Sequence, residues 1–237
     1  MASTSLTWTP SGAGSQQKTT LSMWLKKSVP SNAGYIFEVN DGSNQFVIRE
    51  SNAQIKFWHF NGSSYDWEAE ITPLLRDVSG WYNFVMSIDT TQSTSSNRIK
   101  WYVDGTQQSI STRYSGYPAQ NRSSPLNAGV HGGVTYKHYV GHQGPYAENF
   151  EGRLGEVIFI DGSIYAPSQF AHDVGGTWTA KNPDAENITW GTNGHWLQFL
   201  EADNLGKDTS GNDNNFTVSN MGTDHKETSN LPPTDSS

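Results

Sequence analysis

Hydrophobic and polar residues alternate with a period of two along much of this chain. The segments that alternate are residues 21–25, 35–39, 55–59, 82–88, 99–103, 155–162 and 195–200. In the first of them Leu21, Met23 and Leu25 share one face, and in the second Tyr35 and Phe37 do. Strands that bury one face and expose the other show this pattern. The pattern therefore predicts a chain built mainly from half-buried β-strands.

Turn signals stand between these segments. Four pairs of Asp or Asn with Gly follow alternating runs: Asp41-Gly42, Asn61-Gly62, Asp104-Gly105 and Asp161-Gly162. Such pairs adopt the positive φ angles of tight hairpins, so they indicate antiparallel neighbours. Helical signals are confined to residues 72–80 and 166–176, where Pro73 and Pro167 precede a later Gly. We expect an all-β, two-sheet antiparallel sandwich with short helical turns.

The chain has 237 residues, enough for one well-buried domain, and we expect a single domain over residues 1–237. Two stretches fall outside the strand pattern. Residues 112–150 are rich in Gly, Pro and aromatic side chains, and we interpret them as a long functional loop. The tail from about residue 220 to 237 lacks apolar periodicity, so we expect it to be extended or flexible.

Charge and cysteine content exclude several kinds of partner. The net charge is −8, so the basic surface that binds nucleic acid is missing. No apolar run approaches the length of about 20 residues that spans a bilayer, so we expect no membrane insertion. The chain has no cysteine, which excludes disulfides and thiol catalysis and fits maturation in a reducing cytoplasm.

Several segments resemble a known family in their order. "LSMWLKKS", "GWYNFVMSIDTT", "NRIKWYVDG" and "FEGRLGEVIFIDG" resemble laminin-G-like, concanavalin A-like jelly-roll domains. The later pieces "APSQF", "GGTWTAK", "GTNGHWLQF" and "DTSGNDN" resemble the version in tail-fibre and other virion surface proteins of bacteriophages. The resemblance covers nearly the whole chain. It implies a jelly-roll binding module, often carbohydrate-binding, on a virus particle. The fold also hosts glycosidases and lyases, so it does not by itself fix the function.

An enzyme of this fold would need paired carboxylates, one as acid and one as nucleophile. The nearest pairs are Glu68 with Glu70, Glu151 with Glu156, and Glu201 with Asp203. Glu68 and Glu70 have the spacing of one strand face, but no third carboxylate follows them. No Gly-x-Ser-x-Gly nucleophile motif is present. We therefore predict no catalytic residues, and a polysaccharide-degrading hydrolase or lyase remains an alternative.

Sugar sites on β-sandwiches combine exposed aromatic faces with polar groups that bind hydroxyls. Since Ile55 and Phe57 share one strand face, Trp58 and Phe60 take the other face. The alternative for any one of these aromatic residues is a place in the core. The predicted ligand-binding residues are Trp58, Tyr65, Trp67, Tyr136, His138, Tyr139, His142 and Tyr146.

The stretch "DTSGNDNN" concentrates oxygen-bearing side chains. It fails the EF-hand pattern, because the sixth residue from Asp208 is Asp213 and the twelfth is Ser219. Two interpretations stay open: a calcium site with Asp208 and Asn212 as ligands, and a structural turn, which we favour slightly. The spacing of His131, His138 and His142 matches no zinc template.

The patterns together with the resemblance favour a non-enzymatic carbohydrate-binding module, and the resemblance implies that it belongs to a phage virion, as a tail-fibre or receptor-binding protein. Its expected partners are bacterial surface polysaccharide and other virion proteins, and its expected place is the virion surface after synthesis in the host cytoplasm. A homotrimer would raise the effective concentration of a weak sugar site, although no coiled-coil heptads are present. The rival interpretation is a structural capsid or tail decoration domain without a ligand.

Overall fold

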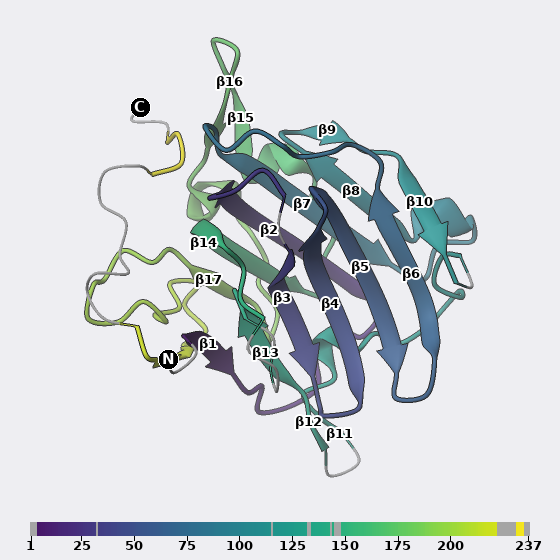
Figure 1. Ribbon diagram of the computed structural model, residues 1–237. Helices are drawn as coiled ribbons and strands as arrows, with labels where there is room; N and C mark the ends of the chain where they lie inside the picture. Colours follow the sequence, from purple (N-terminus) through teal and green to yellow (C-terminus); the bar gives the residue numbers. More distant parts are fainter. Residues whose placement is uncertain are drawn as a thin grey trace.

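The computed structural model describes residues 4–31, 33–114, 116–131, 134–142, 144, 148–221 and 231–234. Two large antiparallel sheets pack face to face (Figure 1). This architecture confirms the predicted all-β, two-sheet sandwich. Within the described ranges, no helix is long and apolar enough to cross a membrane.

The larger sheet has eight strands. In spatial order they are β10 (Ile110–Arg113), β6 (Tyr65–Ile71), β5 (Gln54–Asn61), β4 (Asn44–Ser51), β3 (Ala33–Asn40), β13 (Lys137–Val140), β1 (Ser5–Trp8) and β18 (Thr217–Ser219). The strands β3 to β6 form a meander, because each pairs with the next along the chain.

The second sheet has six strands. In order they are β17 (His195–Leu197), β14 (Gly152–Asp161), β2 (Lys18–Lys27), β7 (Tyr82–Asp89), β8 (Ile99–Val103) and β9 (Thr106–Gln107). Two small hairpins stand apart: β11 (Val130–His131) with β12 (Val134–Thr135), and β15 (Ala171–Val174) with β16 (Thr177–Ala180). The 3₁₀ turns are η1 (Ser95–Asn97), η2 (Pro125–Asn127), η3 (Pro167–Gln169) and η4 (Pro183–Glu186).

Three of the four predicted Asx-Gly turns close hairpins, after β3, β5 and β8. Their glycines have positive φ, at +98° for Gly42, +89° for Gly62 and +72° for Gly105. The fourth pair, Asp161-Gly162, does not close a hairpin, because the chain leaves β14 there for η3. Asp161 instead accepts a hydrogen bond from the Ser15 N–H at 2.7 Å, which ties this corner to the N-terminal segment.

Two expectations for the segments outside the strand pattern need correction. Residues 72–80 form no helix, and residues 166–176 form only η3 before the chain enters the β15–β16 hairpin. The stretch 112–150 is not one long loop. It contains β13, which lies between β3 and β1 inside the large sheet. The strand β13 has only four residues, and two of them, Lys137 and His138, are polar. It is therefore too short and too polar to show the alternation of a half-buried strand.

The main core fills the space between the two sheets. Phe57 of the large sheet stacks on Trp101 of the second sheet, with ring centroids 4.8 Å apart. A second apolar cluster covers the opposite face of the six-stranded sheet, where Ile158 and Phe170 are buried. The six-stranded sheet is therefore apolar on both faces, whereas the outer face of the eight-stranded sheet carries polar and aromatic side chains.

Two histidines lie within the main core. His138 contacts Trp8 at 5.0 Å and His195 at 5.7 Å between ring centroids. His195 stacks on Phe159 at 5.1 Å with an interplanar angle of 9°. Both histidines are fully buried among aromatic rings, and burial lowers both of their pKa values.

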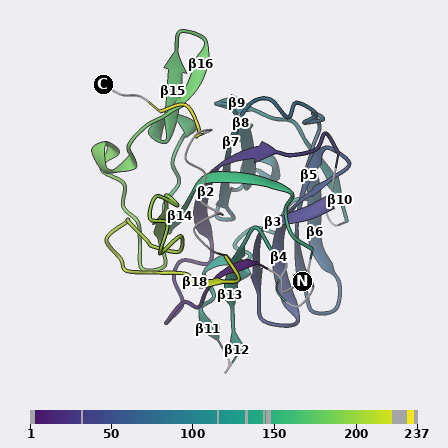
Figure 2. The ribbon, with the colours of Figure 1, turned by 60° about the vertical axis from the view of Figure 1, so that its left-hand side comes forward.

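The end of the chain returns to the sandwich. Residues 231–234, yellow in Figure 2, run beside β16, where the Ala180 N–H donates to the Pro233 carbonyl. Residues 222–230 and 235–237 of the expected flexible tail lie outside the described residues. The single-domain assignment stays a prediction.

Candidate functional site

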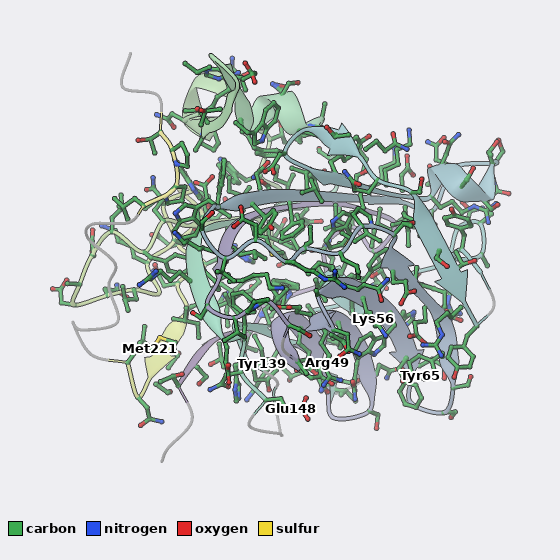
Figure 3. The ribbon with its side chains drawn as sticks, turned by 45° about the horizontal axis from the view of Figure 1, so that its top comes forward. Arg49, Lys56, Tyr65, Tyr139, Glu148 and Met221 are labelled. Carbon is green, nitrogen blue, oxygen red and sulfur yellow. The ribbon has the colours of Figure 1, made fainter. Side chains whose placement is uncertain are left out.

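The register of the eight-stranded sheet places side chains from six strands in one row on its outer face. Consecutive partners across the sheet are Tyr139, Glu38, Val47, Trp58, Glu68 and Arg113. Figure 3 shows Tyr139, Arg49, Lys56 and Tyr65 spread along this side of the molecule. Because the inward residues of the same strands form the core, this row is presented away from it.

Aromatic rings dominate one end of this outer face. Trp58 lies edge-on to Tyr35 at 6.1 Å and to Tyr65 at 6.4 Å between ring centroids. Phe60 also meets Tyr65, at 5.5 Å. Tyr65 stacks on Tyr114 at 5.0 Å with an interplanar angle of 8°. We call Tyr35, Trp58, Phe60, Tyr65 and Tyr114 the aromatic array.

The outer end of the aromatic array is open to solvent. Tyr65 is 39% exposed and Tyr114 is 56% exposed. Trp58 and Tyr35, by contrast, are buried at the base of the array. The buried rings hold Tyr65 in place through edge-on contacts, and such contacts stabilise by about 0.5–1.5 kcal/mol each. The exposed tyrosines thus form a supported aromatic surface rather than isolated side chains.

Charged groups border the aromatic array. The Arg49 guanidinium lies 5.1 Å from the centre of the Tyr35 ring and pairs with Glu148 at 2.9 Å. The Arg113 guanidinium lies 5.8 Å from the Tyr114 ring centre. Guanidinium groups above aromatic faces are attracted by the ring quadrupole, and their N–H groups remain hydrogen-bond donors. The array is therefore edged with hydrogen-bond donors.

The other end of the row is polar and partly closed. Glu38 is buried, accepting hydrogen bonds from Asn40 Nδ2 and from the Gly144 N–H, each at 2.7 Å. Burial raises the pKa of Glu38 above its usual value, against the opposing effect of these hydrogen bonds. Tyr139 lies beside Glu38 in the sheet register and is half-buried.

Three of the predicted ligand-binding residues lie on this face, and two others lie in the core. Trp58, Tyr65 and Tyr139 all lie on it. Trp67 is 3% exposed and contacts Phe46 and Phe57 in the core. It faces inward because it pairs with His59, whose side chain also faces inward. Trp67 is therefore a core residue, and the fully buried His138 is another; neither offers a surface to a ligand.

The remaining predicted residues are scattered. Tyr136 packs against the main core, and burial together with a hydrogen bond to Asp41 raises its pKa to about 12. His142 is buried and its Nδ1 lies 2.6 Å from the Asn149 side-chain oxygen. Tyr146 lies outside the described residues. His138 and His142 thus have separate structural partners, and the side chain of His131 also lies outside the description.

Two β-bulges explain the aromatic residues that the periodicity misplaced. Strict alternation put Tyr35 on the same face as Phe37, but the register shifts between these residues and turns Tyr35 outward. A second shift, between His59 and Phe60, pairs Phe60 with Tyr65, so that Tyr65 joins Phe60 on the outer face instead of following Trp67 inward. Bulges turn side chains to new directions and leave no mark in a two-residue period. Tyr114, just after β10, carried no sequence signal at all.

One carboxylate pair of the enzyme alternative, Glu68 with Glu70, is also on the outer face. Glu68 and Glu70 share it, as their spacing predicts. Glu68 pairs with Arg113 at 3.5 Å, and Glu70 pairs with Lys56 at 3.7 Å. Each carboxylate of this pair therefore has a cationic partner on a neighbouring strand.

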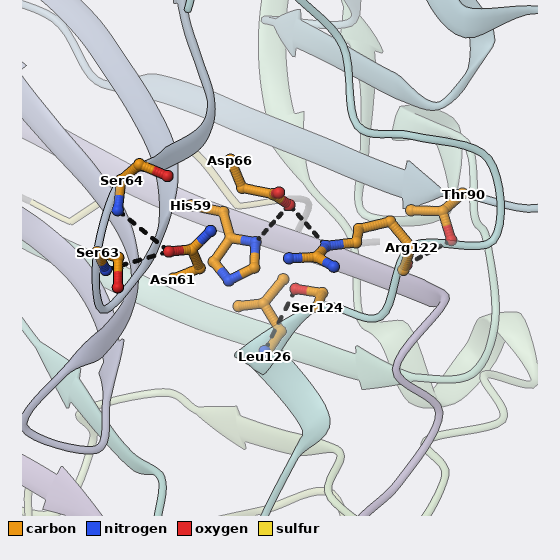
Figure 4. A network of polar contacts seen from close by, with 9 residues as sticks. All are labelled: His59, Asn61, Ser63, Ser64, Asp66, Thr90, Arg122, Ser124 and Leu126. Atoms are coloured by element: carbon orange, nitrogen blue, oxygen red, sulfur yellow. Dashed lines mark hydrogen bonds and ion pairs between the residues drawn. The ribbon is translucent and has the colours of Figure 1, made fainter. Parts of the chain in front are cut away.

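A histidine and an aspartate also lie together near this sheet, but they form a brace between segments. Asp66 Oδ2 lies 3.1 Å from His59 Nδ1 and accepts from Arg122 Nε at 2.7 Å (Figure 4). Ser124 Oγ accepts from the Leu126 N–H. Burial lowers the pKa of His59, although the nearby Asp66 opposes this. The contacts connect the β5–β6 hairpin to the segment around residue 122.

The side chains of the loop around residues 208–214, proposed above as a calcium site, form hydrogen bonds within the loop and to neighbouring segments. Asp208 accepts the N–H groups of Trp196 at 2.8 Å, and of Ser210 and Asn214 at 2.9 Å each. Asn212 Nδ2 donates to the Gly191 carbonyl at 2.7 Å. In the part of the chain that the structure describes, no cluster of three or more His, Asp or Glu residues could hold a metal. Both oxygens of Asp208 thus accept hydrogen bonds from N–H groups, as in a structural turn, and calcium binding by Asp208 and Asn212 stays a prediction.

Comparison with known proteins identifies the family of this chain. A family model described as the concanavalin A-like lectin/glucanases superfamily (Laminin_G_3) matches residues 2–164. The chain belongs to this superfamily. No curated protein matches it.

Solved structures resemble this concanavalin A-like chain at low sequence identity. One is a Bacteroides ovatus protein named as a candidate carbohydrate binding protein, with 12% identity, a TM-score of 0.50 and coverage of 93% of this chain and 61% of that chain. Another is the mouse laminin alpha1 chain, domains LG4-5, with 12% identity, a TM-score of 0.46 and coverage of 66% and 39%. At such identities the similarity shows the fold alone. The chain spans less than two thirds of both of these proteins.

Proposed function

We propose that this chain is a non-enzymatic carbohydrate-binding module, and that its sugar site is the outer face of the eight-stranded sheet around Tyr65 and Tyr114. The carrying observation is the pair of stacked, exposed tyrosines supported from below by buried rings and bordered by Arg113. Flat aromatic faces stack on the apolar face of a pyranose ring, and adjacent charged and amide groups bind its hydroxyls. Membership in a superfamily named for lectins and glucanases agrees with a carbohydrate ligand.

The setting of the proposal is a phage virion. The module would serve in a tail fibre or receptor-binding protein that attaches to a bacterial surface polysaccharide, held by other virion proteins. The support is the order of segments such as "APSQF", "GTNGHWLQF" and "DTSGNDN", which resembles virion surface proteins. A homotrimer would present three sites together, which raises the avidity of weak sugar binding.

Binding rather than hydrolysis is favoured by the pairing of the outer-face carboxylates. Glu68 forms an ion pair with Arg113 at 3.5 Å and Glu70 forms one with Lys56 at 3.7 Å, so each carboxylate is engaged by its own cation. A calcium ion at Asp208 is the weaker part of the proposal, since the carboxylate already accepts backbone donors. Removal of calcium by a chelator should leave sugar binding unchanged if the loop is a turn.

The test is binding of the labelled protein to a panel of bacterial surface polysaccharides, with release of oligosaccharides followed in the same samples. The proposal expects saturable binding to some members and no release. Release of oligosaccharides would contradict the non-enzymatic assignment. Absence of binding to every member would favour the structural decoration role.

A further inference from the structure

A pocket of about 400 Å³ lies where the chain passes from β9 to β10. It is placed between the open edges of the two sheets, because β9 and β10 are the last strands of their sheets on this side. Its walls come from η1, β8, β9 and the residues that lead into β10. Pockets of roughly 300–1,000 Å³ hold small ligands, so the volume is sufficient for part of a glycan.

The wall of this pocket is polar, and its described residues are uncharged. Six of the eight residues that line it carry an amide or a hydroxyl group. The side chains of Asn97 and Gln107 are exposed, and within the described ranges neither forms a hydrogen bond. Gln108 is held in position, since its Nε2 donates to the Thr106 carbonyl at 2.8 Å. Amides and hydroxyls both donate and accept hydrogen bonds, so they match the hydroxyl groups of an uncharged sugar.

The strand β10 connects this pocket to the aromatic array. Ile110, its first residue, lines the pocket, and Tyr114 follows its last residue. The strand forms the right-hand edge of the large sheet in Figure 1. Four residues of extended chain span roughly 13 Å, which is longer than one sugar ring. Ser111, Thr112 and Arg113 are all exposed, and an edge strand also presents unpaired backbone N–H and C=O groups. Polar groups therefore follow the whole path from the pocket to the array.

The backbone is strained at the array end of this path. Tyr114 has a φ of +37°, a conformation that bulky side chains rarely adopt. The stack on Tyr65 accompanies this conformation. Strained residues persist only where their surroundings hold them, and they gather at ligand sites. The exposed ring of Tyr114 is thus held in a defined position at one end of β10.

The charges on the outer face of the large sheet cancel in pairs. The ion pairs are Arg49–Glu148, Lys56–Glu70 and Arg113–Glu68. An acidic glycan would have to compete with these carboxylates for their cations. The net charge of −8 also disfavours the approach of an acidic polysaccharide. An uncharged glycan meets neither obstacle.

We propose that the pocket beside β9 is a further subsite of the sugar site, and that the ligand is an uncharged linear oligosaccharide that runs along β10. This inference rests on the proposed function. One sugar of the chain stacks on Tyr114. A later sugar exchanges hydrogen bonds with Asn97 and Gln107 in the pocket, and the sugars between them lie along the exposed edge of β10.

The test is calorimetric titration with size-fractionated fragments of the uncharged polysaccharide that binds best in the panel. The proteins are the wild type, the double variant Asn97→Ala/Gln107→Ala and the control Asn204→Ala. Asn204 is an exposed amide between β17 and β18, which lie at the edges opposite β9 and β10. Because all three side chains are exposed, melting temperatures should stay unchanged.

The expected result is a dependence of affinity on fragment length. Fragments that span β10 should bind the wild type roughly tenfold more tightly than disaccharides, because they reach both amides. The double variant should reduce this gain to less than about threefold, and Asn204→Ala should keep it in full.

Each contrary outcome points to a different failure. An equal gain in the double variant and the wild type, with binding still weakened by Tyr114→Ala, would overturn the subsite and leave the proposed sugar site standing. Tightest binding by acidic members of the panel would overturn the uncharged class of ligand. Absence of binding to every member would overturn both this inference and the proposed function.

Discussion

Acidification should unfold this protein through the two core histidines, His138 and His195. Burial lowers the pKa of His195 to about 4, although the charge of Asp208 opposes this. Burial and the neighbouring His195 lower the pKa of His138 well below its ordinary value. Both rings therefore stay neutral in the native state, whereas in the unfolded chain they titrate near pH 6.5. As the pH falls below that value, the unfolded state takes up protons that the native state does not.

The size of the effect follows from the difference in bound protons. Stability falls by about 1.4 kcal/mol per pH unit for each histidine that is charged only when unfolded. Between about pH 6.5 and 5, His195 thus costs about 2 kcal/mol, and with His138 the loss is about 4 kcal/mol. Since small domains have a total stability of roughly 5–15 kcal/mol, this loss is a large share.

The measurement is urea unfolding followed by tryptophan fluorescence at a series of pH values. His138→Phe keeps a planar ring and should reduce the loss of stability between pH 6.5 and 5 by about 2 kcal/mol relative to the wild type. Phe216→Leu, beside His195 but without a titratable group, should lower stability equally at every pH. An unchanged slope in His138→Phe would refute the assignment of acid sensitivity to this pair.

Three further changes probe other parts of the structure. Lys27→Met should lower the free energy of unfolding by roughly 3–5 kcal/mol, because it removes the cation that lies 2.6 Å from the buried Glu50 carboxylate; adding Glu50→Leu should restore most of this loss in urea titrations. Asp208→Ala should cost roughly 3 kcal/mol in the same assay, since three N–H groups lose their acceptor, and added calcium should not change the wild-type melting temperature. Gly105→Ala should cost about 1–3 kcal/mol in thermal unfolding, because its φ is +72° and a Cβ would meet the Trp178 ring at 2.5 Å.

The sandwich could be predicted from local signals. Alternation over residues 82–88 and 99–103 predicts β7 and β8, which pair with each other. The Asx-Gly pairs predict hairpins because positive φ is a property of those residues themselves. The same reasoning fails at Asp161-Gly162, where the following chain crosses to another part of the fold. A turn motif predicts that the chain bends, but tertiary packing determines which segment it pairs with afterwards.

The candidate site was only partly accessible from sequence. Trp58 was correctly placed opposite Phe57, because β5 is regular at that point. The sequence does not show that Trp67 faces the core while Tyr65 faces outward, because the shift of register between them depends on how β6 pairs with β5. Tyr114 joins the array through a stack with a residue 49 positions earlier, and such a contact has no local sequence signature.

The most direct test of the central claim is the affinity of three proteins for the polysaccharide that binds best in the panel: the wild type, Tyr114→Ala and Val174→Ala. Val174 is 48% exposed on the β15–β16 hairpin, away from the aromatic array, and serves as the control. The proposal predicts that Tyr114→Ala weakens binding by about tenfold with unchanged melting temperature, while Val174→Ala binds as the wild type does. Equal affinity of Tyr114→Ala and the wild type would contradict the assignment of the sugar site to this face.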